Sequence, residues 1–170
     1  MSQLIKTQTM EEFMGSWGPM FFREAQKVMV PYYDPQAEES ARWDDAVEAV
    51  PKLRYPFPVQ SSAIAAVAAH LYGRDKKAVF LGADMGTGKT LMSTLAAAIA
   101  SAIGRPRRTV VVVPPHMVNK WVREVESTIP NVRVVNINGG NAISLLQKEV
   151  QKNPKQPNQP EFWVVGRVRA

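Results

Sequence analysis

Residues able to bind phosphate occur together in the stretch 82–90, Gly-Ala-Asp-Met-Gly-Thr-Gly-Lys-Thr. Gly86 and Gly88 allow the backbone to turn tightly and aim successive N–H groups at one point, which a Cβ atom would obstruct. Lys89 can place an ammonium group on the β- and γ-phosphates of a nucleoside triphosphate, and the Thr90 hydroxyl is a hard oxygen ligand for Mg²⁺. Lys89 and Thr90 are therefore the candidate catalytic residues. The predicted nucleotide-binding loop comprises Asp84, Met85, Gly86, Thr87, Gly88, Lys89 and Thr90.

Two elements must position this loop. Residues 78–82 form a short apolar run that predicts a buried strand, and a helix is expected to open at Lys89. The unsatisfied N–H groups at the start of that helix, and the positive end of its dipole, would add to the attraction for phosphate. The usual pattern begins with a glycine where this chain has Ala83. An accidental strand-turn-helix is the alternative, but the strand before and the helix after favour a phosphate-binding loop.

The composition sets the broad class of the protein. The 170 residues suggest one domain, or one domain with an appendage, and 45% apolar residues can form a sizeable core. There is no cysteine, which excludes disulfides, thiolate zinc sites and cysteine nucleophiles. The chain begins with no secretory signal, and the apolar stretch 91–103 is too short to span a membrane. We therefore expect a cytoplasmic or nucleoid-associated protein with no membrane partner.

Charge is distributed unevenly along the chain. Residues 1–50 carry 4 Lys/Arg and 9 Asp/Glu, whereas residues 51–170 carry 17 and 6. A basic nucleotide-binding part suggests a second polyanionic partner, most simply nucleic acid. A basic surface that serves only solubility is the alternative, and charge alone does not separate the two.

Residues 1–50 are predicted to form an α-helical N-terminal extension. Thr9 and Glu12 have the spacing of a capping box, which indicates a helix start. Gly15 should end this helix, and Pro19 should start another. The helices expected in the extension cover residues 9–15, 19–30 and 36–49.

Strands and helices are expected to alternate after the proline-rich connector 51–58. Continuous runs of β-branched residues, such as 109–113, are typical of parallel strands that are covered on both faces. The pattern predicts an α/β fold with an open, mainly parallel sheet flanked by helices, and the phosphate loop at the carboxyl end of the first strand. The further strands are expected at 109–113, 132–137 and 161–165, and the helices at 59–72, 91–103, 117–127 and 141–150, the last with Ile143, Leu146 and Val150 on one face.

Three segments in this order resemble a known family. They are Leu53-Arg54 with Pro58-Val59-Gln60, then 83–90, then 110–121 with Glu124. Together they are similar to the opening half of the first RecA-like lobe of a helicase superfamily 2 ATPase. The Swi/Snf-type DNA translocases resemble them most, with DEAD/DEAH-box helicases as the wider class. The resemblance is good over 53–128 and rests on pattern over 129–168. The predicted domains are thus the helical extension 1–50 and a partial RecA-like lobe, 51–170.

The resemblance implies roles at the matching positions. Gln60 would bind adenine through its side-chain amide, which can both donate and accept a hydrogen bond. Val59 stands where the family usually has an aromatic residue, so the resemblance does not supply base stacking. Contacts to a nucleic-acid backbone, most simply that of double-stranded DNA, would set position without reading sequence. The residues implied in these contacts are Pro114, Pro115, His116, Lys120, Arg123 and Arg167.

One feature of the family is missing from the 170 residues. The Asp-Glu pair that orders Mg²⁺ and the attacking water does not occur after Lys89. A second RecA-like lobe is missing as well. The resemblance therefore implies the N-terminal ATP-binding portion of an ATP-dependent DNA helicase or translocase, truncated before the Asp-Glu motif and unable by itself to hydrolyse ATP. The acidic residues that follow Lys89 are Glu124, Glu126, Glu149 and Glu161.

Two other functions stay open at this point. One is a different phosphate-loop enzyme, such as a small-molecule kinase or an assembly ATPase, although Gln60 and the Pro-Pro…Trp segment at 114–121 count against it. The other is a basic module that binds nucleic acid or a protein partner without turnover.

Overall fold

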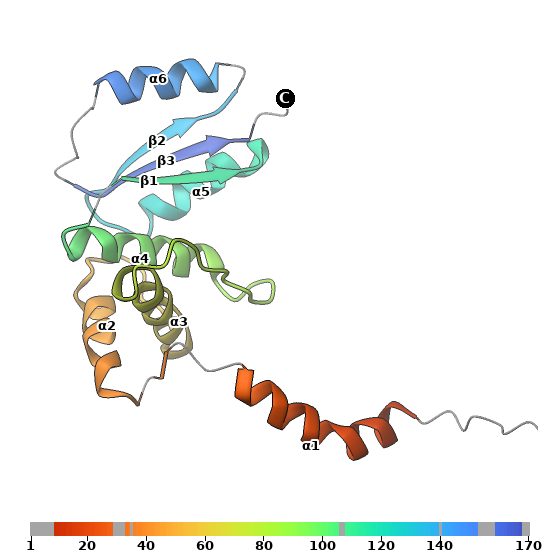
Figure 1. Ribbon diagram of the computed structural model, residues 1–170. Coiled ribbons are helices and arrows are strands. Elements are labelled where there is room, and N and C mark those ends of the chain that lie inside the picture. The colour runs from red at the N-terminus through yellow and green to blue at the C-terminus, as the bar shows by residue number, and fades with distance from the viewer. Residues whose placement is uncertain are drawn as a thin grey trace, which may run out of the picture. The chain divides into compact units, whose positions relative to one another are not determined.

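The computed structural model describes residues 9–28, 33–34, 36–105, 108–139, 141–152 and 159–167 (Figure 1). The chain divides into two compact units, one within Met1–Tyr32 and the other within Tyr33–Ala170. Within the described residues, no helix combines the length and the apolarity needed to cross a bilayer. Residues 1–8 and 153–158 lie outside the described residues.

The first unit contains α1 (Met10–Val28). Its predicted start is confirmed, because the Thr9 N–H donates to Glu12 Oε2 at 3.0 Å and the Glu12 N–H donates to Thr9 Oγ1 at 3.2 Å. The prediction of two separate helices is wrong, since α1 continues through Gly15 and Pro19. Gly15 lies four residues before Pro19, where a proline ring crowds the carbonyl, and glycine has the backbone freedom to adjust there.

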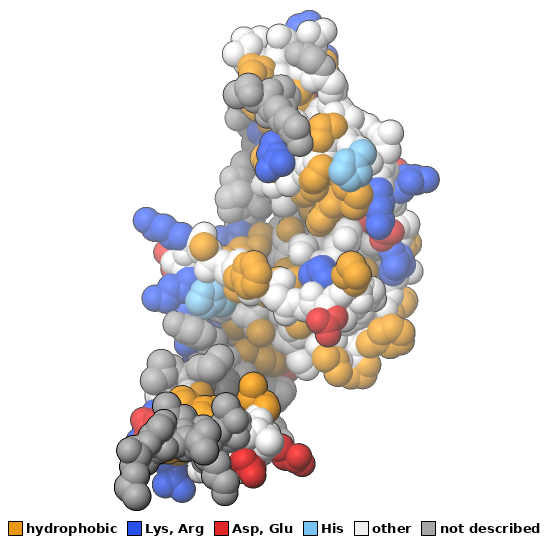
Figure 2. Space-filling model, turned by 90° about the vertical axis from the view of Figure 1, so that its right-hand side faces the viewer, with side chains coloured by type: hydrophobic (Ala, Val, Ile, Leu, Met, Phe, Trp, Pro, Cys, Tyr) orange, Lys and Arg blue, Asp and Glu red, His pale blue; other side chains and the backbone are white. Residues whose placement is uncertain are grey.

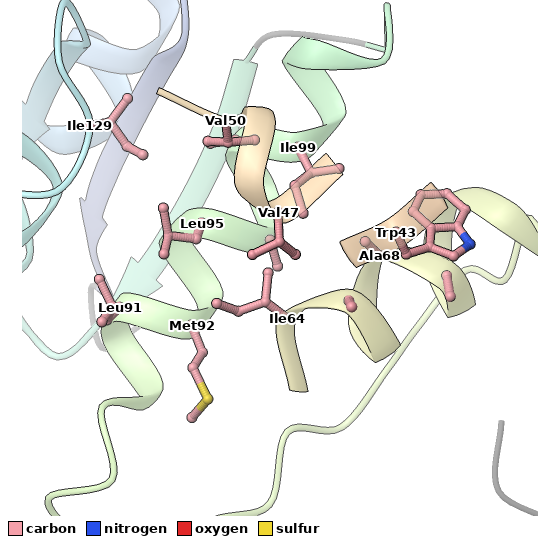
Figure 3. Close-up of a cluster of buried hydrophobic side chains, with 14 residues drawn as sticks. Trp43, Val47, Val50, Ile64, Ala68, Leu91, Met92, Leu95, Ile99 and Ile129 are labelled. Atoms are coloured by element: carbon pink, nitrogen blue, oxygen red, sulfur yellow. The ribbon is translucent and has the colours of Figure 1, made fainter. Parts of the chain in front are cut away.

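The second unit begins with helices that pack together. They are α2 (Glu38–Ala49), α3 (Pro58–Ala68), the π-helical turn η1 (Ala69–Gly73) and α4 (Lys89–Ala102). Figure 3 shows Val47 of α2, Ile64 of α3 and Ile99 of α4 within one buried cluster. Trp43 of α2 is buried against η1, where a Cβ atom on Gly73 would come within 2.6 Å of the indole ring.

This packing bears on the N-terminal extension expected from the sequence. α2 belongs to the larger unit, and the two units divide near residue 32, whereas the sequence places a boundary at residue 50. The predicted domain limits stay a prediction. Trp43 and Val47 are buried, so α2 packs into the larger unit through its apolar side chains.

The sheet contains β1 (Arg108–Val113), β2 (Arg133–Ile137) and β3 (Glu161–Gly166), in the order β1-β3-β2. Both pairings are parallel, so the predicted α/β class with a parallel sheet flanked by helices is confirmed. Figure 1 shows α5 (Val118–Glu126) and α6 (Ala142–Lys152) on opposite sides of the sheet. A 3₁₀ turn, η2 (Pro115–Met117), joins β1 to α5.

The helix predicted at 141–150 forms as α6, and its spacing places Ile143, Leu146 and Val150 on one face as expected. That face does not pack on the sheet, because Ile143 is 69% exposed and Val150 is 48% exposed. Ala142 and Leu146 contact the sheet instead. A helix that starts with Ala142 against the sheet brings residue 146, one turn later, to the same face.

The strand predicted at 78–82 is absent, and among the residues that the structure describes none before the turn at 83–88 forms a strand. A strand needs a hydrogen-bonded neighbour, and this segment pairs with none of the three described strands. Phe80 is 93% exposed, while the Ala78 carbonyl lies 3.0 Å from Nε2 of His70 in η1. The segment therefore reaches α4 along the helical part of the unit rather than through the sheet.

Candidate nucleotide loop and strand-end surface

The residues before α4 form a tight turn. Gly86 has φ = 82° and Gly88 has φ = 84°, both in the left-handed region that L residues rarely adopt. Gly88 is the residue immediately before α4, so the turn passes directly into the first helical residues, Lys89 and Thr90. The structure thus shows why glycine suits both positions: each has a backbone conformation that other residues adopt only with strain.

Lys89 folds back onto the turn that precedes it. Its ammonium group donates to the Ala83 carbonyl at 2.8 Å and to the Asp84 carbonyl at 2.6 Å. The Thr87 hydroxyl also donates to the Asp84 carbonyl, at 2.8 Å. These contacts close the loop around the lysine, so an anion that binds here meets a positive charge already in position.

The backbone donors of the turn complete the arrangement. Within the described residues, no hydrogen bond joins the N–H groups of Met85, Gly86, Thr87 or Gly88 to another protein group. The first N–H groups of α4 have no partner within the helix, as at any helix start. Amide donors together with an ammonium group suit the oxygens of a phosphate.

Metal ligands are scarce near the turn. The half-buried Thr90 supplies one hydroxyl, and the part of the chain that the structure describes contains no group of three His, Asp or Glu residues able to hold an ion. A Mg²⁺ ion at Thr90 would therefore need oxygens from the nucleotide as well.

Gln60, near the start of α3, contacts the turn directly. Its Nε2 donates to the Thr87 carbonyl at 2.8 Å, and its Oε1 accepts the Phe57 N–H at 2.8 Å. A Cβ atom on Gly88 would lie 2.6 Å from Gln60 Nε2. The role of Gln60 toward adenine stays a prediction. In this conformation its amide ties α3 to the loop, a contact that the sequence pattern did not reveal because it joins residues 27 positions apart.

The predicted nucleic-acid contacts lie at and near the carboxyl ends of the strands. His116 follows β1 and Arg167 follows β3, and the Arg167 N–H donates to the Val113 carbonyl at 2.7 Å. Lys120 and Arg123 lie on α5, one and two turns beyond His116. Figure 2 shows basic and hydrophobic side chains close together on the face in view. All six predicted residues are exposed: Pro114, Pro115, His116, Lys120, Arg123 and Arg167.

The connector before α3 contacts α5. Arg54 Nη1 donates to Glu124 Oε2 at 2.5 Å, and the Leu53 N–H donates to the Thr128 carbonyl at 2.8 Å. These bonds join the first and third of the segments that resemble the helicase family. Sequence alone could not show the contact, because 70 positions separate Arg54 from Glu124.

A comparison with protein-family models finds a match over residues 52–161, described as an SNF2-related domain. The match begins in the connector before α3 and ends at the first residue of β3, so it includes the turn around Lys89 and all of α5. A search of curated proteins found no match to the chain.

Proposed function

We propose, from the premise that this chain belongs to the SNF2-related domain family, that it is the ATP-binding portion of an ATP-dependent translocase acting on nucleic acid. Proteins of this family are ATP-dependent enzymes that act on nucleic acid and use ATP with Mg²⁺. The observation that carries the proposal is the turn at Gly86 and Gly88, which encloses the Lys89 ammonium group at the start of α4.

Each part of the turn has a task in this proposal. The backbone N–H groups from Met85 to Gly88 and the ammonium group of Lys89 bind the β- and γ-phosphates, which requires Lys89 to exchange its carbonyl contacts for phosphate oxygens. The Thr90 hydroxyl binds Mg²⁺, which would neutralise phosphate charge when bound. Gln60 holds the turn against α3, and binding of the base would require its amide to exchange its bonds to Thr87 and Phe57 for bonds to adenine.

Phosphoryl transfer also needs a positioned water and charge stabilisation. The 170 residues contain no Asp-Glu pair after Lys89 to order the metal and the water. The chain tested by itself is therefore expected to bind ATP weakly and to leave it intact.

The first test measures ATP on the purified 170-residue chain. We expect weak, Mg²⁺-dependent binding, followed by chemical-shift changes at the amides of Gly86 and Gly88, and no release of phosphate. Lys89→Ala should weaken the binding at least about tenfold, because one charge-assisted contact to phosphate is lost. Lys76→Ala, at an exposed lysine outside the turn, serves as the control. Phosphate release that Lys89→Ala abolishes would contradict the expected lack of turnover.

We further propose that one surface binds the backbone of double-stranded DNA. This strand-end surface consists of Pro114, Pro115, His116, Lys120, Arg123 and Arg167. Binding should weaken as salt rises, since cations on the protein displace counterions from the phosphates. Lys120→Ala is expected to lower the affinity for duplexes of different sequence by the same factor, and to reduce the salt slope by about one. Fluorescence anisotropy at several salt concentrations measures both. Lys148→Ala on α6 is the matched control, and an equal loss in this variant would contradict the assignment.

A second candidate function is a nucleic-acid-binding module without turnover. The missing Asp-Glu pair favours it for the chain tested alone. In that case DNA binding would be unaffected by ATP and by Lys89→Ala, whereas the translocase proposal expects ATP to change the affinity for DNA.

A further inference from the structure

Asn138 lies where the carboxyl ends of the three strands meet. It directly follows β2, and its side-chain Nδ2 donates to the Pro115 carbonyl, in the turn that follows β1, at 3.2 Å. Its Oδ1 accepts the Gly139 N–H at 2.9 Å. Because β1 and β2 are the two outer strands, the side chain joins the edges of the sheet across the central strand.

The central strand leaves room for this contact by ending in glycine. A Cβ atom on Gly166 would lie 2.4 Å from Asn138 Oδ1 and 3.2 Å from its Cγ. Gly166 is buried, and its backbone has no positive φ that would by itself require glycine. The close approach of Asn138 is therefore the reason in this structure for glycine at position 166.

Two backbone hydrogen bonds, next to Pro115 and Gly166, shape the strand-end surface. The Met117 N–H donates to the Pro114 carbonyl at 2.8 Å and holds the turn η2, while the Arg167 N–H donates to the Val113 carbonyl at 2.7 Å. The Pro115 carbonyl, which receives Asn138, belongs to η2. Loss of the Asn138 contact would release this turn, which carries His116, from the end of β2.

We propose that Asn138 is a positioning residue, which holds the turn after β1 to the end of β2, across the end of β3, so that His116 and Arg167 meet a nucleic-acid backbone as one surface. This inference rests on the proposed binding of nucleic acid at the strand ends. Asn138 acts through the turn and makes no contact with the nucleic acid itself.

The first experiment measures binding of a 20-base-pair DNA duplex by the 170-residue chain. Asn138→Ala should weaken the affinity about fivefold, the effect of losing one hydrogen bond that orders the surface. The slope of affinity against salt should stay unchanged, because every cationic side chain remains. The control is Asn136→Ala, two residues earlier on β2, which removes a comparable amide bond, to Asn119 Oδ1 on α5 (3.0 Å), and leaves the bond to η2 in place. Equal affinities of the two variants would overturn the proposal and leave DNA binding by this surface intact.

A second variant displaces Asn138 without changing its chemistry. Gly166→Ala places a methyl group where the Asn138 amide lies, so it should reproduce the loss seen in Asn138→Ala. The double variant should lose no more than either single variant, because both remove the same contact. Additive losses would contradict the proposal.

Hydrogen exchange tests the positioning role without DNA. In Asn138→Ala the amides of Met117 and Arg167 should exchange faster than in the unaltered chain, whereas Asn136→Ala should leave both unchanged. Unchanged exchange in Asn138→Ala would overturn the proposal. If the unaltered chain binds no DNA, the proposed nucleic-acid function fails, and the exchange measurement still decides whether Asn138 holds the turn.

Discussion

Gly88→Ala is expected to lower the free energy of unfolding by about 2 kcal/mol and to abolish the weak binding of ATP. About 1 kcal/mol arises because alanine adopts the left-handed conformation at φ = 84° with strain. About another 1 kcal/mol follows from loss of the hydrogen bond between Gln60 Nε2 and the Thr87 carbonyl, because the new methyl group would lie 2.6 Å from that nitrogen. Chemical denaturation and titration with ATP measure the two effects.

Gly86→Ala separates the two contributions. Gly86 has nearly the same φ, 82°, but no heavy atom lies within 4 Å of the position of its Cβ atom. This variant should therefore lose only the strain, about 1 kcal/mol. The double variant Gln60→Ala/Gly88→Ala has no clash, so restoring glycine at position 88 in the Gln60→Ala background should recover only the strain. Equal losses in Gly86→Ala and Gly88→Ala would show that the contact between α3 and the turn adds nothing.

The contrast between these glycines illustrates how far the sequence could predict the site. The requirement for glycine at 86 and 88 follows from local backbone geometry, and the structure places both in the left-handed region. The start of α1 at Thr9 is likewise local, because both partners of the capping box lie within four residues. The parallel pairing of β1 was predictable from the β-branched run 109–113. The expectation that this strand is covered on both faces is wrong, because Val110 is 54% exposed and Val112 is 63% exposed.

Features that depend on distant residues were not predictable in this way. An apolar run such as 78–82 becomes a strand only if another strand lies beside it, and no local pattern supplies that neighbour. Two side-chain contacts also join separate segments. Gln60 of α3 donates to the turn before α4, and Asn138 lies against Gly166 and donates to Pro115. The ion pairs of Glu161 with Arg108 and Arg133 also depend on distant residues, because they require the three strands to be in register.

Glu161→Gln is expected to lower the free energy of unfolding by about 3 kcal/mol, the lower end of the usual loss when one member of a buried ion pair is removed. Glu161 is 1% exposed, and its carboxylate accepts Arg108 Nε at 2.6 Å and contacts Arg133 Nη1. These three residues are the first of their strands and stand opposite one another in the sheet. Glutamine keeps the shape but removes the charge that both guanidinium groups share, and the partial exposure of those groups limits the loss. Denaturant unfolding measures it.

Glu149→Gln is the matched control at the edge of the same cluster. Glu149 Oε2 accepts Arg133 Nη2 at 2.7 Å, but the Glu149 side chain lies nearer to solvent than that of Glu161, so the loss of unfolding free energy should be about 1 kcal/mol or less.

The hydrogen bond from Arg133 holds the pKa of Glu149 below its ordinary value. A carboxyl group with a lowered pKa in the folded state stabilises the fold above its unfolded pKa of about 4.3, and this contribution disappears as the pH falls through the folded pKa. The difference between the unaltered chain and Glu149→Gln should therefore be present at pH 7 and shrink below about pH 4. If Glu161→Gln cost no more than Glu149→Gln at pH 7, the buried carboxylate would not be what holds the three strands in register.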